Sequence, residues 1–201
     1  METITKTKIT VDVKSFRELL SGAIVCADSS KYAMPTLNSV ALSMIGNELV
    51  ARATDRYRLI EGKVLLDGDD FNGELPVTLI AISDVKRIIE LSKGINAGYF
   101  IIERDDSGRL SVNVNANTGL MISPIDGNFP SLDQTNNILE LPARKLEPVL
   151  AISFNPKYMA DFGKISKRIS VTFTGEKSPI HVKLDGELVI WRAVLMPVKS
   201  A

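Results

Sequence analysis

The stretch that decides the fold is KITVDVKSFRELLSGAIVCA, residues 8–27. Its first six residues alternate polar and apolar side chains, which is typical of a strand with one buried face. From Lys14 onward the apolar residues recur at helical spacing instead. The stretch therefore predicts a strand at residues 8–13 that leads directly into a helix at residues 14–27.

Three more strands are expected after this helix. Residues 39–55 predict two strands around a turn at Gly46 and Asn47. Residues 57–66 predict the third, again from alternating apolar residues. The first part of the chain thus forms a unit of one strand, one helix and three strands.

The same order of elements occurs a second time. Ser83 or Asp84 is the expected N-cap of the second helix, and Gly94 is its expected end. The DDSG tetrapeptide, residues 105–108, predicts the turn of a hairpin. The expected elements are a strand at 73–80, a helix at 83–94, a hairpin over 98–115 and a strand at 118–125.

A third unit is expected near the C-terminal end of the sequence. Asn155 followed by Pro156 is a strong signal for the start of a helix. The expected elements are a strand at 151–154, a helix at 155–165 and strands within 168–186 and 187–198. A period of about 60 residues is longer than that of common solenoids. The repeat therefore predicts an α+β fold of repeated strand-helix-strands units with helices on one face of antiparallel sheets.

Residues 126–148 lack a clear period and are rich in Asn, Pro and Asp. They are interpreted as a linker with one edge strand at 137–141. A domain boundary is expected near Thr135, which divides the chain into residues 1–134 and residues 135–201.

Composition excludes several classes of protein. The 201 residues contain 24 Lys plus Arg and 24 Asp plus Glu, so net charge indicates no partner. The only cysteine, Cys26, excludes a disulfide framework within the sequence. No apolar stretch reaches the roughly 18 residues of a membrane span, and no signal peptide is visible. A cytoplasmic protein without a membrane partner is expected.

The sequence also lacks the groups of residues that catalysis requires. The only histidine, His181, alternates within a predicted strand, and one His and one Cys cannot form a standard zinc site. There is no nucleophile elbow, no P-loop and no dinucleotide-binding motif. No catalytic residue, no metal and no cofactor are expected, and the sequence favours binding over catalysis.

Positive charge is concentrated on the three predicted helices. Residues 14–27, 84–93 and 155–168 carry nine positive and four negative side chains, although the whole chain is neutral. One interpretation is an ordinary solvated helix surface. The other is a basic surface that follows a nucleic-acid backbone without reading its sequence. The candidate DNA-facing residues are Lys14, Arg17, Lys86, Arg87, Lys93, Lys157, Lys164, Lys167 and Arg168.

Four stretches, in order, resemble one known family. They are MPTLNSVAL at 34–42, ATDRYRL at 53–59, IDGNFPSLD at 125–133, and FNPKYMADF at 154–162 with SPIHV at 178–182 and VLMPVKS at 194–200. Together they resemble the bacterial DNA polymerase III beta subunit family, the beta sliding clamps. The resemblance implies the DNA-clamp fold and a DNA replication processivity factor that is a homo-oligomer.

The resemblance also implies a division of the chain. Residues 1–134 resemble the middle domain of the family, and residues 135–201 resemble only the second half of its last domain. The chain therefore looks like a truncated or minimal form that lacks the first domain. Family members close head to tail around duplex DNA with twelve units. Three units per chain would match that ring as a tetramer, but an open assembly or a monomer remains an alternative.

The resemblance further implies a pocket for the clamp-binding peptides of polymerases and other proteins. Arg56 replaces a glycine of the family motif and Tyr57 replaces its histidine, so peptide preference is expected to differ. The candidate pocket residues are Thr54, Arg56, Tyr57, Arg58, Leu59, Pro130, Lys177, Pro179, Val194, Met196, Pro197 and Val198.

Three hypotheses follow from the sequence. The first is a processivity factor that encircles or tracks duplex DNA, tethers a DNA polymerase through its pocket and is placed by a clamp loader. The second is an adaptor or competitor that binds clamp-binding peptides without forming a ring. The third is an enzyme on an α+β scaffold, which the missing catalytic residues disfavour.

Overall fold

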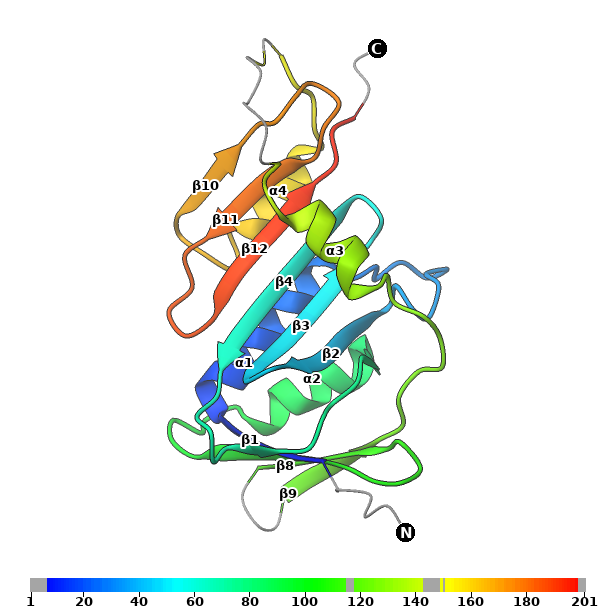
Figure 1. The fold of residues 1–201 in the computed structure, drawn as a ribbon, viewed down its shortest axis with the longest axis vertical. Coiled ribbons are helices and arrows are strands. Elements are labelled where there is room, and N and C mark those ends of the chain that lie inside the picture. The colour runs from blue at the N-terminus through cyan, green and yellow to red at the C-terminus, as the bar shows by residue number, and fades with distance from the viewer. Residues whose placement is uncertain (1–6, 115–117, 143–148, 150, 199–201) are drawn as a thin grey trace.

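The fold is seen in a computed structural model that describes residues 7–114, 118–142, 149 and 151–198. The described residues form two antiparallel sheets with a small number of helices (Figure 1). The α+β fold predicted from the period of the apolar residues is therefore confirmed. Lys199 and Ser200, the end of the last motif, lie outside the described residues.

One sheet has five strands and the other has seven. The smaller sheet has the order β5 (Phe71–Asn72), β1 (Thr7–Asp12), β7 (Tyr99–Arg104), β8 (Leu110–Val114) and β9 (Thr118–Ile122). The larger has the order β10 (Ile169–Thr172), β11 (Ile180–Leu184), β12 (Ile190–Leu195), β4 (Arg58–Leu65), β3 (Glu48–Thr54), β2 (Ser39–Ile45) and β6 (Thr78–Ala81).

The first two units interlock by exchanging their first strands. β1 belongs to the first unit but pairs with β7 of the second, with Ile9 opposite Ile102. β6 belongs to the second unit but pairs with β2 of the first, with Val40 opposite Ile80. Neither unit can therefore complete its sheet without the other.

The seven-stranded sheet also joins the two parts of the predicted division. β4, from residues 1–134, pairs with β12, from residues 135–201, between Lys63–Ile190 and Arg58–Leu195. A single hydrophobic cluster runs through both parts and includes Phe16 and Trp191.

Two helices from the first two units pack against the sheets. In α1 (Val13–Ala23) the Asp12 side chain accepts hydrogen bonds from the amides of Lys14 and Ser15, which caps the helix. The apolar face of α1 packs on β3 and β4, and α1 also contacts α2 (Ile82–Leu91). A short 3₁₀ turn at Ile24–Cys26 ends the helix that was expected to continue to residue 27.

The two faces of β4 carry different helices because successive strand residues point to opposite sides. On one face, a Cβ at Gly62 would lie 2.4 Å from the Trp191 ring and 2.8 Å from Leu19 of α1, so only glycine leaves room for this packing. The other face carries α3 (Leu132–Leu139), in front of the sheet in Figure 1. α4 (Pro156–Phe162) lies behind the sheet with α1.

A buried polar network fixes α3 to its face. The Glu61 side chain is fully buried and accepts hydrogen bonds from Arg52 Nε and Arg192 Nε, both at 2.6 Å. Arg192 Nη2 also donates to Asn136 Oδ1 of α3 at 2.8 Å. Burial raises the pKa of Glu61, but the two arginines outweigh it and the net pKa is lowered, so the carboxylate stays charged.

The expected edge strand at 137–141 is wrong, because Leu132–Leu139 forms helix α3. A capping box at Ser131 and Gln134 starts this helix, and the polar Asn-rich sequence hid it. The Ser83 or Asp84 cap is also wrong: α2 begins at Ile82, with Ala81 as an N-cap that makes no side-chain bond.

The third unit follows its prediction only in part. Its helix α4 is capped by the Asn155 side chain, which accepts from the Lys157 amide, and Pro156 occupies the first turn, as predicted. The expected strand at 151–154 is wrong as a full strand, because its only β pairing among the described residues is a bridge between Ser153 and Val198.

Candidate functional site

The loop between β3 and β4 is held by its own side chains. Thr54 Oγ1 donates to the carbonyl oxygen of Arg58 at 2.7 Å and accepts from the Arg56 amide at 3.1 Å. Asp55 Oδ1 accepts from the amides of Tyr57 and Arg58 at 3.0 and 2.9 Å. These bonds fix a tight turn, which presents Arg56 and Tyr57 to solvent.

Arg56 is the one described non-glycine residue with positive φ, at 76°. A side chain in this left-handed region costs roughly 1 kcal/mol relative to glycine. We expect Arg56→Gly to raise the free energy of unfolding by about 0.5 kcal/mol, since the extra freedom of glycine in the unfolded chain offsets part of the gain. Thermal unfolding measures this change. Arg56→Ala keeps the positive φ with a Cβ, so an equal gain in that variant would refute strain as the cause.

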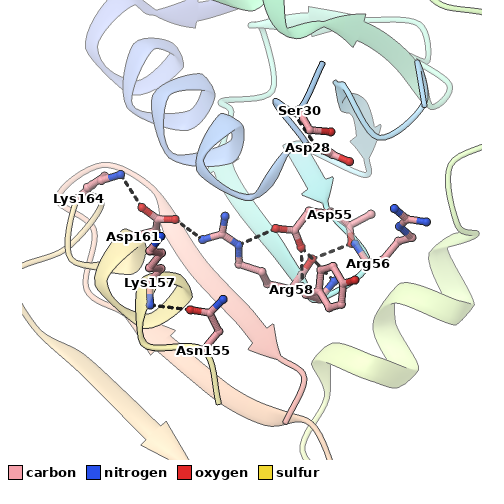
Figure 2. A network of polar contacts seen from close by, with 11 residues as sticks. Asp28, Ser30, Asp55, Arg56, Arg58, Asn155, Lys157, Asp161 and Lys164 are labelled. Carbon is pink, nitrogen blue, oxygen red and sulfur yellow. Dashed lines mark hydrogen bonds and ion pairs between the residues drawn. The ribbon is translucent and has the colours of Figure 1, made fainter. Parts of the chain in front are cut away.

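Arg58 links the loop to α4 (Figure 2). Its Nε donates to Asp55 Oδ2 at 2.9 Å, and its Nη1 donates to Asp161 Oδ2 at 2.7 Å. The guanidinium also lies over the Tyr158 ring, 4.4 Å from its centroid. Only 7% of the Arg58 side chain and 24% of the Asp161 side chain are exposed, so their ion pair is a largely buried connection between residues 103 positions apart.

The charge of Asp161 is stabilised from two sides. Burial raises its pKa, but hydrogen bonds from Lys164 and Arg58 outweigh this effect and the net pKa is lowered. Asp161 therefore remains a carboxylate at neutral pH and balances the cation of Arg58.

A first hollow of about 310 Å³ opens above this network. Tyr57 and Tyr158 stack on one side of it, with ring centroids 5.9 Å apart and an interplanar angle of 21°. Tyr57 is half exposed, so its ring is available to a ligand. The hollow is lined by Ala27, Asp28, Ser29, Ser30, Asp55, Arg56, Tyr57, Arg58 and Tyr158.

A second hollow of about 550 Å³ lies in the third unit. Its volume lies within the range of about 300–1,000 Å³ that is typical of ligand pockets. The Met196 amide, at its wall, donates to the Tyr57 carbonyl oxygen at 2.8 Å and so extends the β4–β12 ladder. The lining residues are Ala151, Ile152, Ser153, Glu176, Lys177, Met196, Pro197 and Val198.

The structure brings most of the candidate pocket residues to these two hollows. Arg56, Tyr57 and Arg58 line the first. Lys177, Met196, Pro197 and Val198 line the second. Leu59 and Val194 instead pack against Leu139, in a small buried cluster between the seven-stranded sheet and α3. Thr54, Pro130 and Pro179 line neither hollow.

The candidate DNA-facing residues differ in how free their charges are. Arg17 Nη1 donates to the carbonyl oxygen of Ser92 at 2.7 Å, which ties α1 to the end of α2. Four others are in ion pairs: Arg87 with Asp84, Lys93 with Glu90, Lys164 with Asp161 and Arg168 with Asp185. Lys14, Lys86, Lys157 and Lys167 are exposed, and no ion pair forms to them within the described part of the chain.

Sequence reasoning missed Tyr158 and Asp161, which complete the first hollow and its charge network. A signal for them was present. Asn155 and Pro156 set the start of α4, and positions 158 and 161 are then three residues apart on one helix face. Asp28 and Ile152 were missed as lining residues, and nothing in their local sequence marks them.

Within the described residues there is no cluster of three or more His, Cys, Asp or Glu that could hold a metal. Cys26 is fully buried, and burial raises the pKa of its thiol far above the usual range. No described helix is long and apolar enough to cross a membrane.

The arrangement of strands and helices matches that of solved DNA polymerase III beta subunits. The structure from Thermotoga maritima has a TM-score of 0.76 and 17% identity, over 96% of this chain and 66% of its own. A sliding clamp from Bartonella birtlesii, bound to griselimycin, has a TM-score of 0.79 and 14% identity, over 100% of this chain and 68% of its own. A putative beta subunit from Eubacterium rectale has a TM-score of 0.77 and 12% identity, over 96% of this chain and 66% of its own.

These likenesses confirm the predicted fold, that of the sliding clamps. The chain spans about two thirds of the length of the clamps it matches. No protein-family model matches the sequence, and no curated protein matches it significantly.

Proposed function

We propose that this chain is a DNA replication processivity factor of the sliding-clamp type. In this role it binds duplex DNA without sequence preference, tethers a polymerase through a peptide groove and catalyses no reaction. The observation that carries the proposal is the clamp fold over 96–100% of the chain. The proposed place of action is the replication machinery in the cytoplasm, with a clamp loader as a further partner.

The helix side of the sheets is the proposed DNA surface. α1 and α4 lie on the same side of the seven-stranded sheet (Figure 1). Three exposed lysines on the helices, Lys14, Lys86 and Lys157, have no ion pair among the described residues. Lys167 has none either, and it lies in the loop between α4 and β10, because α4 ends at Phe162 and not near residue 165 as expected. Lysine side chains at phosphate distance supply affinity through counterion release and do not depend on the base sequence.

Replacement of both Lys86 and Lys167 with Ala should weaken binding to a short duplex. Each lost phosphate contact reduces the slope of log affinity against log salt by about one. The combined loss is therefore about two in that slope, measured by fluorescence anisotropy over a salt series. Lys8→Ala with Lys183→Ala removes two exposed lysines from strands instead. An equal effect of the strand pair would refute the helix side as the DNA surface.

The two hollows are proposed to act together as the peptide groove. Tyr57 belongs to the first and Met196 to the second, and their backbones are hydrogen-bonded. Apolar side chains of a peptide would contact Ile152, Met196 and Val198, and Met adapts readily to different partners. Tyr57 and Arg56 at the rim would set the preference among peptides.

Met196→Ala should weaken binding of a clamp-binding peptide roughly tenfold, because it removes an apolar side chain from the groove wall. Isothermal titration calorimetry measures the change, and griselimycin serves as a second ligand. Met121→Ala is the matched control, since Met121 is exposed on β9, outside both hollows. If Met196→Ala binds as the wild type does, the groove is not the peptide site.

The second candidate is an adaptor that binds clamp-binding peptides without forming a ring. Five of the nine candidate DNA-facing residues already bond within the chain, which favours this alternative. The two candidates differ in duplex binding. An adaptor would bind the peptide in the calorimeter and show no affinity for the duplex at any salt concentration.

A further inference from the structure

The third unit is the only one of the three whose described elements have no companion unit. β2 and β7 are the second strands of the first two units, and each pairs with the first strand of the other unit. β10 holds the same position in the third unit, but it ends the seven-stranded sheet and pairs only with β11 among the described strands. An unpaired edge of this kind is a template for pairing with another chain.

The segments that begin the three units, β1, β6 and residues 151–154, otherwise pair in the same way. Each pairs with the segment that follows the last strand of its own unit: Ile9 with Phe71, Leu79 with Ile125 and Ser153 with Val198. The third unit therefore has the local geometry of the other two. The difference is that the first two units exchange strands with each other, whereas the described part of the third unit exchanges none.

The apolar side chains of the third unit are correspondingly less buried. α1 and α2 contact each other, and their core residues Leu19 and Val85 are fully buried. In α4 the only buried residue is Phe162. Seven of the fourteen partly buried hydrophobic residues around the core lie in the third unit. Ile152 and Tyr158 line the two hollows, and the other five are taken together as the half-covered apolar face: Phe154, Met159, Ile165, Ile169 and Val171.

We propose that the third unit of a second copy of this chain covers this face. The two copies are then related by a two-fold axis, with α4 beside α4 and residues 151–154 of each copy beside β10 of the other. The first two units show the required packing, because they are two copies of the same strand-helix-strands unit that complete each other by mutual exchange. Such an isologous contact closes both β10 edges at once.

The ion pairs of Asp161 limit the charge repulsion between the two α4 helices, on which Lys157 is an exposed cation without an ion pair among the described residues. Asp161 forms ion pairs with both Arg58 and Lys164. The positive charge of Lys164 is therefore balanced within its own copy and does not repel Lys164 of the second copy. Ala160 is small and exposed on α4, and it leaves room for a second helix.

Sedimentation velocity over a dilution series tests the proposal. We expect the wild-type chain to sediment as an assembly of at least two 22.0 kDa chains. Ala160→Arg should at least halve that mass, because it places a long cation between the two helices without altering the core of its own chain. Phe173→Asp, in a residue that is 38% exposed just beyond β10, should have the same effect through an independent position.

Ala97→Arg is the matched control, since Ala97 is also exposed but lies in the loop before β7. It should leave the mass unchanged, and the fluorescence of Trp191 reports that each variant is folded. A wild-type chain that sediments as a monomer throughout, or an Ala160→Arg mass equal to that of the wild type, would overturn the proposal. This outcome is separate from the DNA role: a monomer that binds duplex refutes only the pairing, and a pair that binds no duplex refutes only the processivity factor.

Discussion

Arg58→Ala is expected to lower the free energy of unfolding by about 3–5 kcal/mol, the usual cost of removing one partner from a buried ion pair. The variant leaves the carboxylates of Asp55 and Asp161 without their shared cation. It also removes the cation that lies over the Tyr158 ring. Chemical denaturation followed by circular dichroism measures the loss.

Arg168→Ala is the matched control for this experiment. Arg168 Nε donates to Asp185 Oδ2 at 2.6 Å, so its pair has similar geometry to those of Arg58. Its side chain is 83% exposed, however, and exposed pairs contribute about 0–1 kcal/mol. A loss in Arg58→Ala that is no larger than the loss in Arg168→Ala would contradict the structural role of Arg58.

Trp191→Ala should lower the free energy of unfolding by about 3–5 kcal/mol, as large-to-small substitutions in a core do. Trp191 is 1% exposed and lies on β12. Cβ atoms built at Gly22 or Gly62 would be only 2.4 Å from its ring, so the ring packs directly on the backbones of α1 and β4. The variant opens a cavity at the junction of residues 1–134 and 135–201.

Ile190→Ala provides the comparison, because Ile190 is the preceding residue of the same strand and is 67% exposed. We expect it to change the free energy of unfolding by less than about 0.5 kcal/mol. Far-UV circular dichroism serves both variants, since Trp191→Ala removes the only tryptophan. Equal losses in the two variants would show that the junction does not depend on this packing.

The elements of the fold could largely be predicted from local sequence. Alternating residues at 8–13 and helical spacing from Lys14 gave the first strand and helix, and Asn155 with Pro156 gave the start of α4. Helix α3 could not be predicted in this way. Its hydrogen bond from Arg192 to Asn136 is tertiary, and its segment lacks the apolar period on which the other predictions depended.

Strand partners were harder to predict than strands. The apolar period shows which face of a strand is buried, but it does not show which strand lies beside it. The exchange of β1 and β6 between the first two units, and the β4–β12 pairing, therefore emerged only from the structure.

In the candidate site too, individual residues could be predicted from the sequence, but their distant partners could not. Sequence motifs led to Arg56, Tyr57, Arg58 and Met196, which the structure places in the walls of two hollows that are linked by the Met196–Tyr57 backbone hydrogen bond. They did not indicate that Arg58 is a buried link, because its partner Asp161 is 103 residues away. Arg58 is thus expected to matter first for stability, whereas Arg56 and Tyr57, on the exposed turn, remain candidates for partner choice.

The mass of the chain in solution, alone and with a short fluorescent duplex, tests the central claim most directly. A clamp-type factor predicts an assembly of several 22.0 kDa chains that sediments together with the duplex, whatever its sequence, and releases it as salt is raised. A 22.0 kDa monomer whose sedimentation is unchanged by the duplex at low salt would contradict the account.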